Sequence, residues 1–172
     1  MTSPLPPTLT TDRLTLRPFQ ARDMAPYVAY YTGPRTTGVG GPRPPRVAAE
    51  RFLAMAGQWA VRGFGRYAIA QDGPAFGHVG MMQVAEADPV EMTWTLWDAA
   101  CEGHGYATEA ARAVLAAWRG GPLVVRVDRD NAASLRVAAR LGLAEDGDAA
   151  PPASMPGART FRWAPSPLGA TA

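Results

Sequence analysis

Apolar positions with helical spacing stand out in the second half of the chain, directly after a pair of glycines. Counted from Ala107, they recur with the i, i+3, i+4, i+7 spacing of an amphipathic helix and continue to Trp118. The preceding stretch, residues 92–97, is rich in aromatic and β-branched residues, which is typical of a strand. Gly103 and Gly105 lie between the two. The pattern therefore predicts a strand, a short loop, a glycine turn and then a helix.

The rest of the chain alternates between strand-like and helix-like segments. Polar and apolar residues alternate over residues 13–18, which predicts a half-buried strand. Asp72-Gly73 separates two strand-like segments and is a strong hairpin signal. The expected elements, in chain order, are a strand at 13–18, a helix from Asp23 to about Tyr31, a helix at about 47–62, strands at 65–71 and 76–84, a strand beginning near Glu91, a strand at 123–127, a strand beginning at Leu143 and a last edge strand at 160–163.

This order of elements predicts one mixed sheet. Three consecutive antiparallel strands are followed by strand, helix, strand and helix, so the fold class is mixed α/β. At 172 residues the chain has the length of one domain. We expect that domain to span residues 1–172, with loose tails at about 1–10 and 165–172.

The glycine turn predicts an anion site. The first backbone N–H groups of a helix have no partner within it, and the helix dipole adds positive potential there. Small residues allow phosphates to approach these N–H groups directly. A dinucleotide fold would have a third glycine at Thr108, and a nucleoside triphosphate loop would need a lysine, whereas all 17 basic residues here are arginines. A pyrophosphate-binding turn of another kind is the better interpretation.

Two strings carry a resemblance to the GNAT acetyltransferases. Residues 102–107 (Glu-Gly-His-Gly-Tyr-Ala) resemble their coenzyme A loop, Arg/Gln-x-x-Gly-x-Gly/Ala, and depart from it at Glu102. Residues 131–143, which begin Asn-Ala-Ala-Ser, resemble the later signature of the superfamily. The longer string from Gly103, and the opening at residues 9–17, are similar to the ribosomal-protein alanine N-acetyltransferase branch. The resemblance covers roughly residues 10–164.

The resemblance implies a fold and a coenzyme. The fold would be a mostly antiparallel, six- to seven-stranded mixed sheet, splayed as a V, with about four helices. Acetyl-CoA would be a co-substrate whose pantetheine arm lies in the split. The implied coenzyme-binding residues are Leu96 and Trp97 through their main chains, Gly103, His104, Gly105, Tyr106, Ala107 and Thr108 around the pyrophosphate, and Asn131 on the pantetheine arm.

The resemblance also implies direct attack of an amine on the thioester. Glu91 is our candidate for the general base, because a carboxylate beside an aromatic-lined cleft can have a raised pKa. The alternative is a solvated carboxylate at the end of a strand. Many relatives protonate the leaving thiolate with a tyrosine where this chain has Ala138, and Ser134 is the implied substitute. A purely structural Ser134, bonding to the helix backbone near its cap, is the alternative.

The composition narrows the cellular compartment and the kinds of ligand to expect. Cys101 is the only cysteine, which prevents an internal disulfide and favours a reducing cytoplasm. The two histidines, His78 and His104, are isolated, so no zinc site is expected. A formal charge of +2, without a basic block, does not favour nucleic acid. No apolar stretch approaches the roughly 18 residues that would span a bilayer.

Several questions stay open at this level. The acceptor could be a protein amino terminus or a small amine, and edge strands could pair two copies into a homodimer. The rival to an enzyme is a non-catalytic acyl-CoA-binding or sensor module of the same fold. Glu102 and the missing tyrosine at Ala138 keep this rival open.

Overall fold

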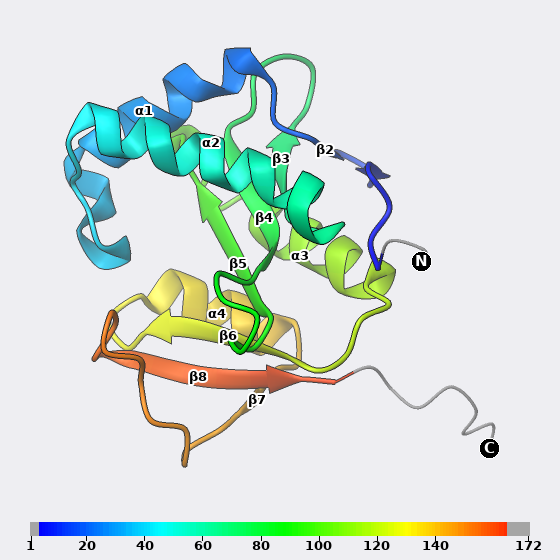
Figure 1. Ribbon diagram of the computed structural model, residues 1–172, viewed down its shortest axis with the longest axis vertical. Helices are drawn as coiled ribbons and strands as arrows, with labels where there is room; N and C mark the ends of the chain where they lie inside the picture. The colour runs from blue at the N-terminus through cyan, green and yellow to red at the C-terminus, as the bar shows by residue number, and fades with distance from the viewer. Residues whose placement is uncertain (1–3, 165–172) are drawn as a thin grey trace.

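The computed structural model describes residues 4–164, which form an eight-stranded sheet with helices on both faces (Figure 1). The strands lie in the order β1-β2-β3-β4-β5-β6-β8-β7. All neighbours are antiparallel except β5 and β6, which are parallel. The strands are β1 (Leu9–Thr10), β2 (Thr15–Arg17), β3 (Arg66–Ala70), β4 (Gly77–Met82), β5 (Glu91–Leu96), β6 (Leu123–Asp128), β7 (Ala144–Glu145) and β8 (Ala158–Trp163). The helices are α1 (Met24–Thr32), α2 (Pro45–Arg62), α3 (Tyr106–Ala117) and α4 (Ala132–Arg140), with short 3₁₀ turns η1 (Ala21–Asp23), η2 (Pro34–Val39) and η3 (Ala99–Cys101).

The sheet parts between its two parallel strands. Within the described residues, β5 and β6 are in register only at Glu91 and Val124. By contrast, β4 pairs with all six residues of β5, and β8 pairs with all six residues of β6. The two halves of the sheet therefore diverge toward the carboxyl ends of β5 and β6. The V-shaped, mostly antiparallel sheet expected from the sequence is confirmed.

The helices cover opposite faces of this sheet (Figure 1). One core cluster joins α3 to the strands through residues such as Met92, Val114 and Val125. The other joins α1 and α2 to the sheet through Tyr27, Phe52, Ala68 and Trp97, among others. Because neighbouring strand residues point to opposite faces, Glu91, Thr93 and Thr95 lie on the α1/α2 face, and Met92, Trp94 and Leu96 lie on the α3/α4 face. This is the alternation that the sequence indicated.

The amino-terminal segment is not a loose tail within the described residues. Leu5 is 1% exposed, and the hydroxyl of Tyr67 donates to the carbonyl of Pro6 at 2.5 Å. Leu9–Thr10 forms β1, which pairs with β2 at the edge of the sheet. The proline-rich composition concealed this packing, because anchoring by a few buried contacts leaves no periodic pattern. The expected tail at 165–172 lies outside the described residues.

The sheet differs from expectation in strand number and order. It has eight strands, above the six or seven expected, because β1 was not expected; β7 is the strand expected to begin at Leu143, and it is only two residues long. The strand that includes residues 160–163 is not an edge strand, because β8 lies between β6 and β7. A two-residue strand is too short to show alternation, so the sequence pattern did not reveal β1. Among residues 4–164, none of the helices combines the length and hydropathy that crossing a bilayer requires.

One buried polar pair supports the centre of the α1/α2 face. His78 on β4 is 2% exposed, and its Nδ1 accepts a hydrogen bond from Nε1 of Trp97 at 3.0 Å. Burial, followed by the charges of Arg66 and Arg51, holds the pKa of His78 well below its usual value. His78 therefore stays neutral in the folded protein and acts as an acceptor.

This neutral histidine predicts a pH-dependent stability. A histidine in an unfolded chain has a pKa of about 6.5, so below that pH the unfolded state binds one proton more than the folded state. Above this pH the neutral His78 makes its full contribution to the free energy of unfolding. That contribution falls by about 1.4 kcal/mol per pH unit as the pH drops toward the lowered pKa of His78 in the folded protein. Urea unfolding between pH 7.5 and 5.5 measures the slope. His78→Gln, which keeps an acceptor for Trp97, should show a shallower slope, and an equal slope would contradict this account.

Candidate active site

The glycine turn has the geometry of an anion site. Gly103 and Gly105 have φ values of +79° and +81°, a region that favours glycine. Gly105 is the N-cap of α3, and no side chain caps the helix there. A Cβ at Gly103 would meet no neighbouring atom within 4 Å, so the turn is open to a ligand. The first N–H groups of α3 are therefore available to bind an anion.

A cleft of about 700 Å³ extends from this turn along the carboxyl end of β5. Strand β5 forms one wall, and α4 forms another. Tyr30, Arg35 and Val39, from α1 and η2, also line the cleft. The cleft therefore follows the line along which β5 and β6 separate. Its lining includes eight residues expected to act in the site: Leu96, Gly103, Gly105, Tyr106, Ala107, Thr108, Asn131 and Ser134.

Three predicted site residues do not line this cleft. Trp97 is buried. Its backbone N–H donates to the carbonyl of Phe76 at 2.7 Å, and its own carbonyl accepts from Nη1 of Arg35 at 2.6 Å. The main-chain groups of Trp97 that were expected to bind coenzyme are thus already bonded within the chain. His104 is exposed and stacks on Tyr106 with ring centroids 5.7 Å apart. The third is Glu91, on the other face of β5.

Asn131 and Ser134 form a linked pair at the start of α4. Oδ1 of Asn131 accepts from the backbone N–H of Ser134 at 3.0 Å and caps the helix. Nε1 of Trp94 donates to Oγ of Ser134 at 3.3 Å. Because the hydroxyl oxygen accepts this bond, its own hydrogen remains free to be donated into the cleft. The structural and the catalytic interpretations of Ser134 are therefore compatible.

Glu91 is held by a cation. Its carboxylate accepts from Nη1 of Arg126 on β6 at 2.6 Å, and its side chain is 12% exposed. Burial raises the pKa of Glu91 above its usual value, although the charges of Arg126 and Arg66 oppose the rise. Glu91 is not the solvated strand-end carboxylate of the alternative interpretation. The sequence predicted its face but did not reveal its partner.

Arg35 compensates for the unusual residue in the coenzyme A loop. Its guanidinium forms an ion pair with Glu102, 67 positions away, and stacks over Tyr30. The resembling family has arginine or glutamine where this chain has Glu102. Arg35 neutralises that carboxylate and places a guanidinium at the lip of the cleft. No local signal could have identified this pair, because it joins η2 to a distant turn.

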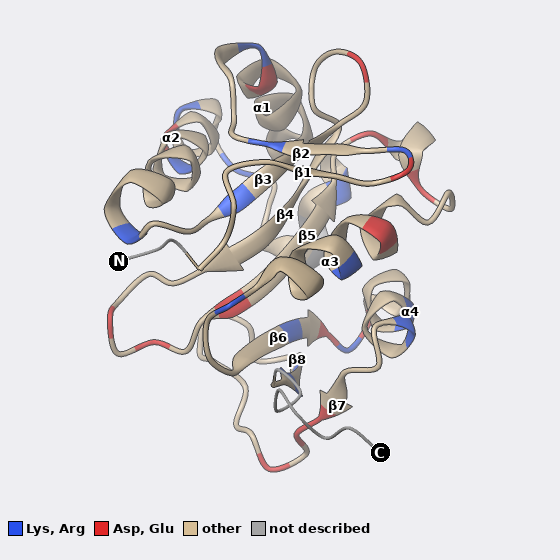
Figure 2. Ribbon diagram, turned by 90° about the vertical axis from the view of Figure 1, so that its right-hand side faces the viewer, with Lys and Arg blue, Asp and Glu red and all other residues tan. Residues whose placement is uncertain are grey.

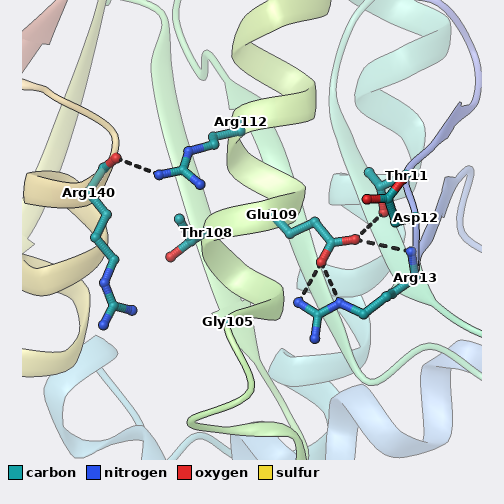
Figure 3. Close-up of a pocket in the computed structure, with 8 residues that line it drawn as sticks. All are labelled: Thr11, Asp12, Arg13, Gly105, Thr108, Glu109, Arg112 and Arg140. Atoms are coloured by element: carbon teal, nitrogen blue, oxygen red, sulfur yellow. Dashed lines mark hydrogen bonds and ion pairs between the residues drawn. The ribbon is translucent and has the colours of Figure 1, made fainter.

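A second cavity of about 490 Å³ continues past the start of α3 (Figure 3). It shares Gly105, Thr108 and Arg140 with the cleft. Nη2 of Arg112 donates to the carbonyl of Arg140 at 2.9 Å, and neither guanidinium has a carboxylate partner within residues 4–164. Basic positions on both α3 and α4 are visible in Figure 2. The lining holds Arg13, Arg112 and Arg140 against Asp12 and Glu109, so its net charge is positive.

Glu109 lies on the other side of the same cavity. It binds Arg13, with Nε to Oε2 at 2.7 Å, and Thr11, with Oγ1 to Oε1 at 2.5 Å (Figure 3). This network ties the start of the chain to α3 and leaves Arg112 without a carboxylate. Thr108 is 6% exposed, faces the Arg140 side of α3, and its Oγ1 has no partner in the described chain (Figure 3). Free N–H groups, unpaired arginines and an unused hydroxyl together fit a diphosphate.

The comparisons with known proteins agree with this geometry. Residues 13–144 match the acetyltransferase (GNAT) domain family. The chain belongs to the GNAT acetyltransferase family. It is 34% identical to an acetyltransferase from Agrobacterium tumefaciens, over 92% of this chain and 94% of that one, with a TM-score of 0.83. A GNAT-family protein from Bordetella pertussis is 26% identical over 90% and 97% of the two chains, with a TM-score of 0.73. No curated protein matched.

More distant GNAT structures share the fold. A ribosomal L7/L12 α-N-protein acetyltransferase, RimL, was solved with coenzyme A and is 16% identical over 91% of this chain and 96% of that one, with a TM-score of 0.73. The microcin C7 self-immunity acetyltransferase MccE was solved with acetyl-CoA and AMP and is 15% identical over 94% and 98%, with a TM-score of 0.75. Membership of the GNAT family makes the enzyme class acetyltransferase, with acetyl-CoA as co-substrate. Within residues 4–164, no group of His, Cys, Asp and Glu could hold a metal ion.

The charged rim of the second cavity predicts a measurable coenzyme contribution. Arg140→Gln removes an unpaired guanidinium that borders both cavities, so the Kd of coenzyme A should rise about tenfold, the effect of a lost charge-assisted hydrogen bond. The salt dependence of binding should weaken as well. Titration calorimetry at two salt concentrations tests this. Arg46→Gln, whose side chain is 90% exposed on α2, is the matched control. An unchanged Kd for Arg140→Gln would contradict the assignment.

Proposed function

We propose that this GNAT enzyme transfers the acetyl group of acetyl-CoA to a primary amine, either a protein amino terminus or a small molecule. The observation that carries the proposal is the continuous cleft between the anion-binding start of α3 and the Trp94–Ser134 pair. A ligand that combines a diphosphate with a long, thin arm fits such a cleft. Family membership supplies the acyl group that such a ligand would carry.

The turn and the opened strand would hold the coenzyme in two ways. The N–H groups of residues 103–108, with the hydroxyl of Thr108, would bind the diphosphate. Beyond Glu91, the backbone of β5 has no β6 partner, so the main chain near Leu96 can pair with pantetheine amides as an added strand would. The amide nitrogen of Asn131, not needed for the helix cap, can contact the same arm. Trp97 and His104 would contribute only indirectly, by packing.

The reaction requires the amine to lose a proton and the leaving sulfur to gain one. The amine nitrogen forms a bond to the acetyl carbon, and the carbon–sulfur bond breaks. Glu91 is our proposed base, acting on the amine through a water because its carboxylate does not border the cleft. Ser134 is our proposed proton donor to the sulfur, since Trp94 leaves its hydrogen free. Ala138, at the usual tyrosine position, is fully buried and has no acidic group.

Replacing the proposed base gives a direct test. Glu91→Gln should lower kcat by roughly 10²- to 10⁴-fold, the usual contribution of a general base. The Kd of acetyl-CoA should stay unchanged, because Glu91 does not line the coenzyme cleft. In the wild type, kcat/KM should rise with pH through a pKa above that of an ordinary glutamate, because the deprotonated carboxylate is the active form and burial raises this pKa. Thiol release followed across a pH series measures kcat and the pH dependence of kcat/KM.

Glu86→Gln is the matched control, since Glu86 is exposed in the turn that leads to β5. Normal turnover by Glu91→Gln would remove Glu91 from the mechanism. The same assay separates the enzyme from a sensor module. Acetyl-CoA binding without amine-dependent thiol release by the wild type, over a broad amine panel, would contradict the proposed function.

A further inference from the structure

Arg66 is a half-buried cation without a partner. It lies at the start of β3, and its Nε is inaccessible to solvent and unpaired. Within residues 4–164, its guanidinium makes no hydrogen bond and no ion pair with any side chain or carbonyl. Desolvation lowers the pKa of Arg66 below its usual value. Removing a charge from water without a counter-ion is expensive, so such a group calls for an explanation.

The neighbours of Arg66 on the same face are also unsatisfied. Arg66 is in register with Gly80 on β4, and Gly80 is in register with Thr93 on β5. Gly80 has no side chain, so nothing from β4 separates Arg66 from Thr93 in this row. Oγ1 of Thr93 is buried and has no partner in the described chain. A guanidinium and a hydroxyl therefore share one row of the sheet without a ligand.

A third unsatisfied atom lies next to Glu91. Arg126 binds Glu91 through Nη1, while its Nε is buried and unpaired. Within residues 4–164, five buried side-chain nitrogen or oxygen atoms lack a partner, and three of them belong to Arg66, Thr93 and Arg126. The charge of Arg66 also acts on the carboxyl of Glu91, although the two form no ion pair. The unsatisfied polar atoms are thus concentrated around the proposed base.

The cleft reaches the α1/α2 side of the sheet at one end. Its lining comes mostly from the glycine turn, α3 and α4, and Tyr30, Arg35 and Val39 contribute from α1 and η2. A nucleophile must approach from the side that the coenzyme does not occupy, and that is the α1/α2 side. Arg66 faces α1 and α2, since its charge acts on Tyr27 and Tyr31 of α1 and on Arg51 of α2. Arg51 is exposed and adds positive charge on this side of the sheet.

We infer that the acceptor is an amine with a carboxylate close to its amino group, and that Arg66 and Thr93 bind this carboxylate beside Glu91. The inference rests on the proposed function and narrows its substrate class. The planar guanidinium of arginine matches a carboxylate with two parallel hydrogen bonds. A phosphate dianion would suffer stronger repulsion from Glu91, and Arg126 is already committed to that residue. The carboxylate is therefore the better match.

Matched acceptor pairs test the inference. Each pair is an α-amino acid and its carboxamide, or a peptide with aspartate or asparagine after its amino terminus. For wild type, kcat/KM should favour the carboxylate member of at least one pair by about tenfold, the value of one charge-assisted hydrogen bond. Arg66→Met should bring that ratio close to one and leave the Kd of acetyl-CoA unchanged. Arg46→Met is the control.

The outcomes separate the two proposals. Thiol release at equal rates for both members of every pair would overturn the inference and leave the proposed function standing. No release from any pair would overturn the inference, and no release from a broad panel of other primary amines as well would overturn both. Faster reaction of an aminophosphonate than of the corresponding amino acid would overturn the choice of carboxylate.

Stability gives a second readout that needs no acceptor. If Arg66 is kept for a ligand, its unpaired charge destabilises the free protein, and Arg66→Met should raise the thermal midpoint by about 2 to 4 °C. Arg46→Met, on the exposed surface, should leave the midpoint unchanged. A lower midpoint for Arg66→Met would show that Arg66 has a structural role, and would overturn the inference.

Discussion

The parting of β5 from β6 is the constraint on which the rest of the site depends. The two strands run side by side and are in register at a single pair, Glu91 and Val124. From there β5 stays with β4, while β6 stays with β8, so backbone groups of β5 lose their neighbour. Unpaired backbone in a protein interior must find other partners. A cleft that supplies such partners to an extended ligand is the direct result, and α3 begins at its mouth.

All of the basic side chains in this site are arginines. Two of them neutralise carboxylates that lie close to the anion-binding turn. Glu102 would repel a diphosphate, but Arg35 reaches it from η2 and neutralises it. Glu109 would do the same at the first turn of α3, but Arg13 and Thr11 engage it. Both carboxylates are thereby removed from the potential around the turn. The arginines that remain without carboxylates, Arg112 and Arg140, border the adjacent cavity.

Local features of this fold could be predicted from the sequence, and long-range ones could not. The positive φ angles at Gly103 and Gly105, and the cap formed by Asn131, depend on neighbouring residues, so their signals lie within a few positions. Alternation along β5 assigned Glu91 to its face correctly. The partners of Glu91, Glu102 and Glu109 lie 35, 67 and 96 positions away, and no periodicity records such contacts. The sequence did not indicate the environment of Arg66 either, because that environment depends on helices packed across the sheet.

The contact between Arg35 and Glu102 joins the two halves of the reaction in one thermodynamic cycle. Arg35 belongs to the segment between α1 and α2, on the proposed acceptor side, whereas Glu102 belongs to the turn proposed to bind the diphosphate. A ligand that changes this ion pair changes the energy of both segments. Linkage then requires reciprocity: if acetyl-CoA alters the affinity for the amine by some factor, the amine alters the affinity for acetyl-CoA by the same factor. A surface ion pair that both ligands perturb would thus couple donor binding to acceptor binding in both directions.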